Sequence, residues 1–241
     1  MLGINQSQRH RFNYFLTRLA LRIVLPILSS PKTIGAFSLG KGPVLLAGNH
    51  ISHFDPPFLC RAFPQKVDFM AMKELFSHPL ARSYFMGNDV FPVDRHRADS
   101  SALKECVKRL KRGHIVCMFP EGGLRSGQDS VLEGKPLPPG AGAVAHLAEC
   151  PVQPFIIVGT DQLYRWQNVL QRPSVYVVLG TKLILNEQLP SKEARLDLDH
   201  RLEKAIKQLY QNLIKNENLT SEILPKTAQE RWGQTSDSPI K

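Results

Sequence analysis

Short apolar runs alternate with amphipathic stretches along most of the chain. The apolar runs are rich in β-branched and long apolar residues and predict buried strands at 44–47, 67–72, 115–119, 152–158 and 175–179. Helical spacing of apolar residues appears between and after them, at 75–87, 101–112, 141–150 and 192–215. Strands that alternate with helices predict an α/β fold, a single mixed sheet flanked by helices.

Two of the predicted helices have an identifiable inward face. In the 101–112 helix, Leu103, Val107 and Leu110 fall opposite three lysines, and Gly113 follows as a helix stop. The long last helix is predicted to close the fold through its spaced apolar residues, which are Leu196, Leu202, Ile206, Leu209 and Leu213.

The N-terminal segment has a different pattern. Its apolar run at 12–28 is interrupted by Arg18 and Arg22 and falls short of the ~20 apolar residues that a membrane span needs. No small-residue cleavage site follows it, so a signal peptide is not expected. Arg11, Arg18 and Arg22 share one helical face, which predicts an amphipathic helix at a membrane interface with anionic lipids. The alternative is a helix packed on the domain with its arginines in water.

The predicted organisation has three parts. Residues 1–34 form the membrane-association segment, 35–217 form one globular α/β domain, and 218–241 form a polar, flexible tail. With 42% hydrophobic residues in 241, the chain has enough apolar material for a buried core. Its four scattered cysteines form no C-x-x-C pair, which favours reduced, buried thiols.

Positive charge is concentrated in two places. Lys and Arg number 31 against 21 Asp and Glu, a formal charge of +10. Residues 1–54 carry six basic and no acidic residues, and residues 95–112 carry seven basic residues against two acidic ones. Such surfaces bind nucleic acid, anionic lipid headgroups or a phosphorylated substrate.

The first candidate site follows the predicted strand at 44–47. His50 is a natural proton acceptor at neutral pH, and a carboxylate such as Asp55 can fix its tautomer and orientation. Pro56 disfavours the α-region for Asp55, so we expect a turn that brings Asp55 back towards His50. A metal site at His50, His53 and Asp55 is the alternative interpretation.

Two further segments carry groups suited to an anionic ligand. Phe91 to Arg95 opens the basic region, and the guanidinium of Arg95 suits a phosphate unless it pairs with Asp94 or Glu105. Phe119 to Ser126 follows another predicted strand, where a Glu, two glycines and Arg125 could surround a polar anionic group.

Together and in this order, the three segments resemble the lysophosphatidic acid acyltransferase family of 1-acyl-sn-glycerol-3-phosphate acyltransferases. That family carries Asn-His-x4-Asp, Phe-x-x-x-Arg, Phe-Pro-Glu-Gly-x-Arg-Ser and a Val-Pro strand. The matching segments here are 49–55, 91–95, 119–126 and 152–154, and the resemblance covers about residues 35–185. One departure is Gly123-Leu124, where the family has a single residue.

The resemblance implies transfer of an acyl group from acyl-CoA or acyl carrier protein to the sn-2 hydroxyl of a lysophospholipid, without an acyl-enzyme. It makes His50 and Asp55 catalytic and assigns the acceptor to Phe91, Arg95, Glu121, Gly122, Arg125 and Ser126. No cofactor, metal or nucleic acid is implied. The expected location is the cytoplasmic side of a membrane, as a peripheral or monotopic protein. A metal-dependent hydrolase and a non-catalytic module that binds anionic lipid or nucleic acid are the alternatives.

Overall fold

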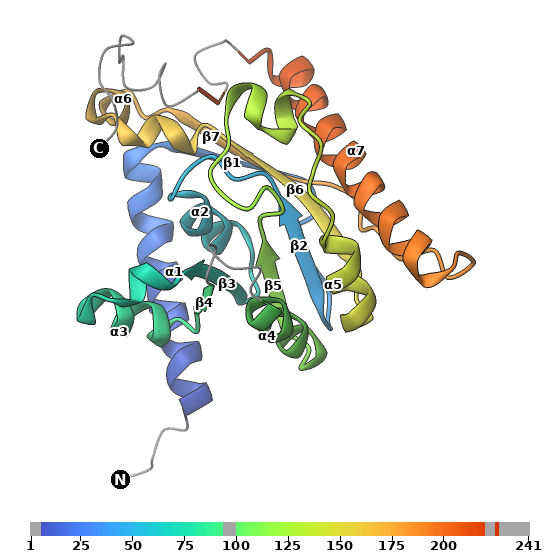
Figure 1. Cartoon of the computed structure of the whole chain (residues 1–241). Coiled ribbons are helices and arrows are strands. Elements are labelled where there is room, and N and C mark those ends of the chain that lie inside the picture. Colours follow the sequence, from blue (N-terminus) through green and yellow to red (C-terminus); the bar gives the residue numbers. More distant parts are fainter. Residues whose placement is uncertain (1–5, 94–99, 220–224, 227–241) are drawn as a thin grey trace, which may run out of the picture.

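The computed structural model describes residues 6–93, 100–219 and 225–226. Its centre is one mixed sheet of seven strands in the order β1-β7-β6-β2-β5-β3-β4 (Figure 1). Neighbouring strands are parallel except for β6 and β7. The strands are β1 (Ser30–Ile34), β2 (Val44–Gly48), β3 (Val67–Met72), β4 (Phe91–Val93), β5 (Ile115–Met118), β6 (Val152–Val158) and β7 (Ser174–Leu179). This confirms the predicted α/β fold with a mixed sheet.

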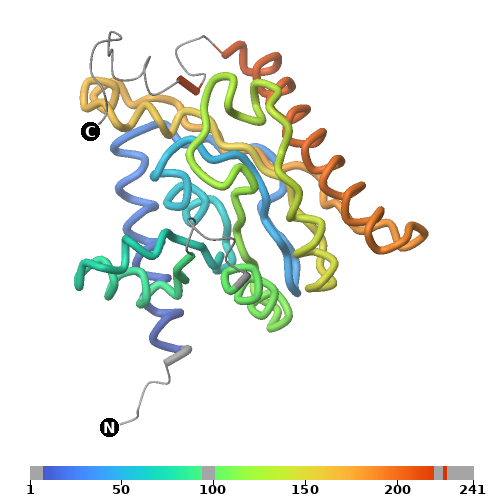
Figure 2. The backbone as a smooth tube through the Cα atoms, in the orientation of Figure 1, coloured from blue at the N-terminus to red at the C-terminus, as the bar shows by residue number. Residues whose placement is uncertain are grey.

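Helices cover both faces of the sheet. The α-helices are α1 (Gln6–Leu28), α2 (Asp55–Ala62), α3 (Pro79–Gly87), α4 (Ser100–Lys111), α5 (Ala141–Ala148), α6 (Trp166–Leu170) and α7 (Ser191–Glu217). Short 3₁₀ helices are η1 (Lys73–Phe76), η2 (Gly127–Asp129), η3 (Val131–Glu133) and η4 (Thr160–Tyr164). Figure 2 shows the blue α1 and the orange-red α7 on opposite sides of the molecule.

The sheet divides the core into two layers because side chains alternate along each strand. In β2, Leu45 and Ala47 point into the layer under α4, α5 and α7, whereas Val44 and Leu46 point into the layer under α1 and α2. All five β2 residues are buried. The continuous apolar runs of the central strands therefore reflect burial on both faces.

Two predicted helix faces differ in part from the observed ones. In α4 the buried residues are Ala102, Cys106 and Leu110, and Leu103 is 37% exposed. In α7 the prediction was wrong for Leu196, which is 42% exposed, because the inward stripe begins at Ala194 and continues four residues later. The other predicted α7 residues are buried or packed against the core.

The helix predicted at 75–87 is split in two. η1 ends at Phe76 and α3 begins at Pro79, with His78 extended between them at φ −82° and ψ 126°. A residue before proline avoids the α-region, whereas proline itself suits the first turn of a helix. Proline therefore divides the segment where periodicity alone predicted continuity.

Helix α1 packs on the domain but presents an apolar face to solvent. Tyr14 and Leu25 are buried in the core, and Arg18 donates a hydrogen bond to the carbonyl of Pro64 at 2.8 Å. Arg18 is therefore half-buried and tied to the domain, whereas Arg11 and Arg22 are exposed, and their placement at a membrane interface stays a prediction. The outward surface of the helix also carries apolar side chains between 44% and 65% exposed: Phe12, Phe15, Leu16, Leu19, Ile23, Val24 and Ile27.

No described helix is long and apolar enough to cross a membrane. Directly after α1, Ser30–Ile34 pairs with β7 as an edge strand, so these residues of the predicted N-terminal segment belong to the sheet. Most of the predicted tail at 218–241 lies outside the described residues.

Candidate active site

Three parallel strands bring the sequence motifs to one edge of the sheet. β2 lies between β5 and β6, so the C-terminal ends of all three strands meet there. His50 follows β2, Glu121 follows β5 and Thr160 follows β6. The carboxyl edge of parallel strands is where open α/β sheets place their ligands.

His50 and Asp55 form a buried pair. The ring Nδ1 of His50 lies 2.7 Å from Oδ2 of Asp55, and the two residues are 6% and 0% exposed. A carboxylate only accepts hydrogen bonds, so Nδ1 carries the proton and Nε2 keeps its lone pair. Phe119 stacks on the imidazole with ring centroids 3.9 Å apart. The ring is thus fixed, with its basic nitrogen available.

The chain reaches this geometry by a route other than the predicted turn. Asp55 is the first residue of α2, and Pro56 and Pro57 occupy the first turn, where proline is tolerated. Oδ2 of Asp55 also accepts hydrogen bonds from the N–H groups of Ile51 and Ser52 at 2.8 and 3.0 Å. The contact with His50 is as predicted, but a helix start holds it.

Asn49 extends the sheet beyond the end of β2. Its side-chain amide donates to the carbonyl of Ile157 and accepts from the N–H of Ile157, both at 2.8 Å. The Asn49 side chain thus makes the two hydrogen bonds that a backbone residue of a paired strand would make. These bonds help to fix the backbone position of His50, the next residue. Asn49 itself is fully buried.

Glu121 holds the backbone of His50 from the other side. Its Oε2 accepts from the N–H of His50 at 2.7 Å, and its Oε1 accepts from Ser130 Oγ and the N–H of Val131 at 3.0 and 2.8 Å. Burial raises the pKa of Glu121, and the bonds from Val131 and His50 oppose that rise. Both oxygens accept bonds from the protein and the residue is 8% exposed, so its contacts support the His50 loop, and its predicted contact with the acceptor stays a prediction.

An apolar cavity of about 340 Å³ opens beside His50. Its walls come from α1, α2, β3, α3 and the loop after β5, and include Tyr14, Leu21, Pro57, Cys60, Phe69, Met72, Tyr84, Phe85, Val90 and Leu124. A mainly apolar pocket with His50 and His53 at its wall suits a ligand with a hydrocarbon part.

The comparisons agree with this architecture. The family model described as Acyltransferase matches residues 28–158. The chain belongs to the Acyltransferase family. The 1-acyl-sn-glycerol-3-phosphate acyltransferase of Bacillus subtilis is 30% identical over 152 residues, 62% of this chain and 72% of that protein. The protein of the same name from Streptococcus pneumoniae is 28% identical over 145 residues, 59% of this chain and 51% of that protein.

A solved structure shares the fold. The crystal structure of the 1-acyl-sn-glycerophosphate (LPA) acyltransferase PlsC from Thermotoga maritima superposes with a TM-score of 0.61 at 20% identity, covering 86% of this chain and 84% of that one. The protein described here is therefore an acyltransferase with an α/β fold of this kind.

The structure places the predicted acceptor residues of this acyltransferase unequally. Arg95 lies outside the described residues. Phe91 is buried in β4 at 4% exposure, with the guanidinium of Arg109 4.6 Å from its ring centroid, and it does not line the cavity. The structure gives no support to its predicted substrate contact, because the ring belongs to the core.

The loop after β5 comes much closer to His50. The N–H of Arg125 donates to the carbonyl of His50 at 2.7 Å, while its side chain is exposed and has no hydrogen bond or ion pair among the described residues. Gly122 is exposed at φ +71°, and Ser126 is half-buried with an extended backbone. This loop therefore borders the site and leaves the Arg125 guanidinium available.

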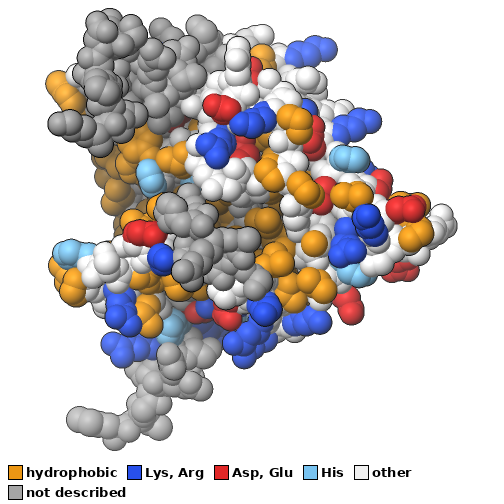
Figure 3. Space-filling view, viewed as in Figure 1, with side chains coloured by type: hydrophobic (Ala, Val, Ile, Leu, Met, Phe, Trp, Pro, Cys, Tyr) orange, Lys and Arg blue, Asp and Glu red, His pale blue; other side chains and the backbone are white. Residues whose placement is uncertain are grey.

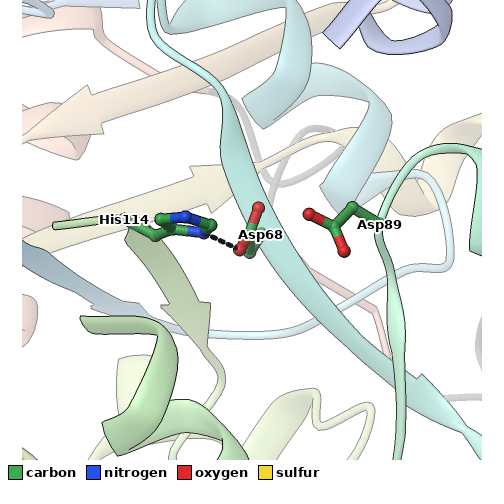
Figure 4. A group of neighbouring side chains, drawn as sticks. All are labelled: Asp68, Asp89 and His114. Atoms are coloured by element: carbon green, nitrogen blue, oxygen red, sulfur yellow. Dashed lines mark hydrogen bonds and ion pairs between the residues drawn. The ribbon is translucent and has the colours of Figure 1, made fainter. Parts of the chain in front are cut away.

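The described residues give no support to a metal at His50, His53 and Asp55. His53 Nδ1 bonds to the hydroxyl of Tyr164, and the only convergent ligand group in this part of the chain is Asp68, Asp89 and His114 (Figure 4). That group lies at the N-terminal ends of β3, β4 and β5, whereas His50 lies at the C-terminal ends of the strands.

Two cations already occupy the space between those carboxylates. Lys66 Nζ lies 2.7 Å from both Asp68 and Asp89, and Arg109 Nη1 lies 2.9 and 3.2 Å from them. Burial favours a raised pKa for Asp89, but Lys66 and Arg109 outweigh it and hold that pKa below its usual value. The cluster is therefore an internally balanced ion-pair network.

The cysteines are all free and buried. Cys60 lines the cavity, and burial raises the pKa of its thiol to about 11. Burial also raises the pKa of Cys117 well above its usual value. A protonated thiol is a poor nucleophile, so these pKa shifts disfavour Cys60 and Cys117 as reactive groups.

Proposed function

We propose that this acyltransferase transfers a fatty acyl group from acyl-CoA or acyl carrier protein to the sn-2 hydroxyl of 1-acyl-sn-glycerol 3-phosphate. The names of the two bacterial relatives support this acceptor and a role in phospholipid biosynthesis. The observation that carries the proposal is the fixed His50–Asp55 pair at the wall of an apolar cavity.

In the proposed reaction, Nε2 of His50 takes the proton of the acceptor hydroxyl as that oxygen attacks the thioester carbon. The C–S bond then breaks, the thiolate leaves with its electron pair, and the proton from His50 can pass to it. Asp55 stabilises the imidazolium formed in between. General base catalysis of this kind contributes about 10²–10⁴-fold to a rate.

The phosphate of the acceptor requires cationic partners near His50. Arg125 supports this requirement because its backbone is bonded to His50 and its guanidinium is available. A guanidinium binds phosphate through a fork of N–H donors. We assign Arg125 to the phosphate, with Arg95 as a second partner on the basis of the family motif.

The apolar cavity is proposed to hold an acyl chain. Burial of hydrocarbon contributes about 0.8 kcal/mol per CH₂ group, so several methylenes would anchor the chain strongly. This binding energy, remote from the reacting atoms, positions the hydroxyl and the thioester for attack.

The exposed apolar face of α1 is proposed to lie on the membrane where the lipid acceptor resides. Figure 3 shows hydrophobic side chains gathered along the edge of the molecule where α1 runs. Leu80, Tyr84 and Met86 of the neighbouring α3 are also exposed, at 77%, 53% and 51%. The anionic cytoplasmic leaflet attracts basic segments, which favours attachment on that side.

The experiment is an assay of purified protein with a panel of lysophospholipids and both donors. His50→Ala should lower kcat by about 10²–10⁴-fold, roughly 3–5 kcal/mol of barrier, and leave the fold intact by circular dichroism. His53→Ala is the matched control and should have a much smaller effect. Wild-type turnover by His50→Ala would contradict the proposed mechanism.

A further inference from the structure

Oδ1 of Asp55 accepts a hydrogen bond from Thr160, a residue outside the family motifs. Oδ2 accepts three hydrogen bonds, from His50, Ile51 and Ser52. Oδ1 accepts one, from the hydroxyl of Thr160 at 2.5 Å, and has no other donor within the described ranges. Both Thr160 and Asp55 are 0% exposed, so water does not replace this donor.

The end of β6 is built to present this hydroxyl. Gly159 directly follows the strand with φ +92°, and a Cβ there would lie 2.3 Å from the carbonyl oxygen of Ser174. Only glycine fits both the conformation and the space. η4 begins at Thr160, directly after the turn at Gly159. Asn49, the residue before His50, is hydrogen-bonded to Ile157 near the end of the same strand.

We propose that Thr160 is a positioning residue for catalysis, which acts through Asp55. Its hydroxyl fixes the plane of the carboxylate, so Oδ2 points at Nδ1 and the imidazole presents Nε2 to the acceptor. The inference rests on the proposed function, because it assumes that His50 is the base. A buried carboxylate oxygen without a donor would carry its negative charge unsatisfied and would turn towards other donors.

Thr160→Val tests the hydroxyl at nearly constant shape. Loss of a hydrogen bond to a charged group predicts a fall in kcat of about 10–100-fold. KM for donor and acceptor should change by less than about threefold, since no substrate contact is removed. Thr160→Ser should restore most of the kcat. If Thr160→Val does not fold at the assay temperature, Thr160→Cys replaces it, with the same expected fall from a weak donor.

A matched control separates this effect from a general loss of stability. Tyr210 is also buried and its hydroxyl also donates to a carboxylate, that of Glu133, at 2.9 Å. Tyr210→Phe should lower the melting temperature without lowering kcat. An equal fall in kcat in Tyr210→Phe and Thr160→Val would overturn the inference.

A double-mutant cycle tests whether Thr160 acts through Asp55. In an Asp55→Asn background, Thr160→Val should change kcat by less than about twofold. A full additional loss there, or wild-type kcat in Thr160→Val while His50→Ala is inactive, would overturn the inference and leave the proposed function standing. Wild-type turnover in His50→Ala would instead overturn the proposed function itself.

Discussion

Two buried carboxylates hold different parts of His50. Asp55 bonds to the imidazole, and Glu121 bonds to the backbone N–H of the same residue. Burial raises the pKa of Glu121, and its N–H and O–H donors oppose that rise by favouring the charged form. The base is therefore fixed at both its ring and its main chain.

This arrangement makes a specific prediction for Glu121→Gln. The amide NH₂ must face either His50 N–H or the pair formed by Ser130 Oγ and Val131 N–H, so at least one donor loses its acceptor. We expect a loss of about 1–3 kcal/mol in the free energy of unfolding and a fall in kcat of roughly tenfold.

Thermal melting and steady-state kinetics would measure both effects of Glu121→Gln. Glu133→Gln is the control, because among the described residues the Glu133 side chain accepts only from Tyr210, and its replacement keeps an acceptor. A rise in acceptor KM alone, at unchanged stability, would support the predicted contact of Glu121 with the acceptor.

Sequence motifs identified some of these residues and contacts and not others. The spacing of His50 and Asp55 predicted their pairing, because five residues at a strand end can fold back locally. Thr160 lies 105 residues from Asp55, and only the sheet order brings the two together. The contact of Glu121 with the backbone of His50 was not predicted, because a motif identifies a residue type but not the direction of its side chain.

At the scale of elements, α1 makes two kinds of contact, and they can be separated. Tyr14 and Leu25 belong to the core, whereas Phe15 and Ile23 are 59% and 60% exposed. The double substitution Phe15→Gln and Ile23→Gln should therefore leave the melting temperature nearly unchanged. It should weaken sedimentation with anionic vesicles by about tenfold or more, because two large side chains contribute roughly 1.5–3 kcal/mol each on burial.

Ile184→Gln provides the control for the α1 variant, since Ile184 is 68% exposed but lies outside the helices. Its vesicle binding should equal that of the wild-type protein. Unchanged binding of the α1 variant would place the membrane contact elsewhere on the surface. The acyltransferase activity of the α1 variant should fall on an acceptor embedded in a bilayer and remain unchanged on a short-chain, water-soluble acceptor.

Central elements were predictable and edge elements were not. The runs at β2, β5, β6 and β7 are largely buried on both faces, as is the first half of β3, so apolar content alone identified them. β1 has the polar sequence SPKTI and β4 has only three residues with a central proline. Edge strands tolerate proline and charge, which removes the pattern by which strands are identified.

At the scale of the whole molecule, the ion-pair network ties the sheet to α4 at the edge away from His50. Asp89 has a lowered pKa despite the effect of burial, because Lys66 and Arg109 favour its charged form. An acid with a lowered folded pKa stabilises the fold above its unfolded pKa and loses that contribution as pH falls through the folded value.

Asp89→Asn should therefore be less stable at pH 7 by roughly 1–3 kcal/mol, between the values for surface and buried pairs. The difference in melting temperature from wild type should shrink as the pH is lowered below about 4, where the unfolded carboxyl is also protonated. Melting curves between pH 7 and pH 3 would show this. Asp129→Asn, at an exposed pair with Lys135, should have a smaller effect. A difference in melting temperature between Asp89→Asn and wild type that stays constant from pH 7 to pH 3 would contradict the stabilising role of the charged Asp89.

The attachment of α1 to the domain has a consequence for how substrate arrives. Arg18 bonds to the carbonyl of Pro64, Arg172 bonds to that of Pro26, and the Tyr14 hydroxyl accepts from the N–H of Val67. With these ties along its length, we expect the helix to hold a fixed position relative to His50. Once α1 rests on a leaflet as proposed, His50 keeps a constant height and tilt above the lipid. The acceptor then reaches the base by lateral diffusion, and turnover follows its mole fraction in the surface and not its concentration in the surrounding water.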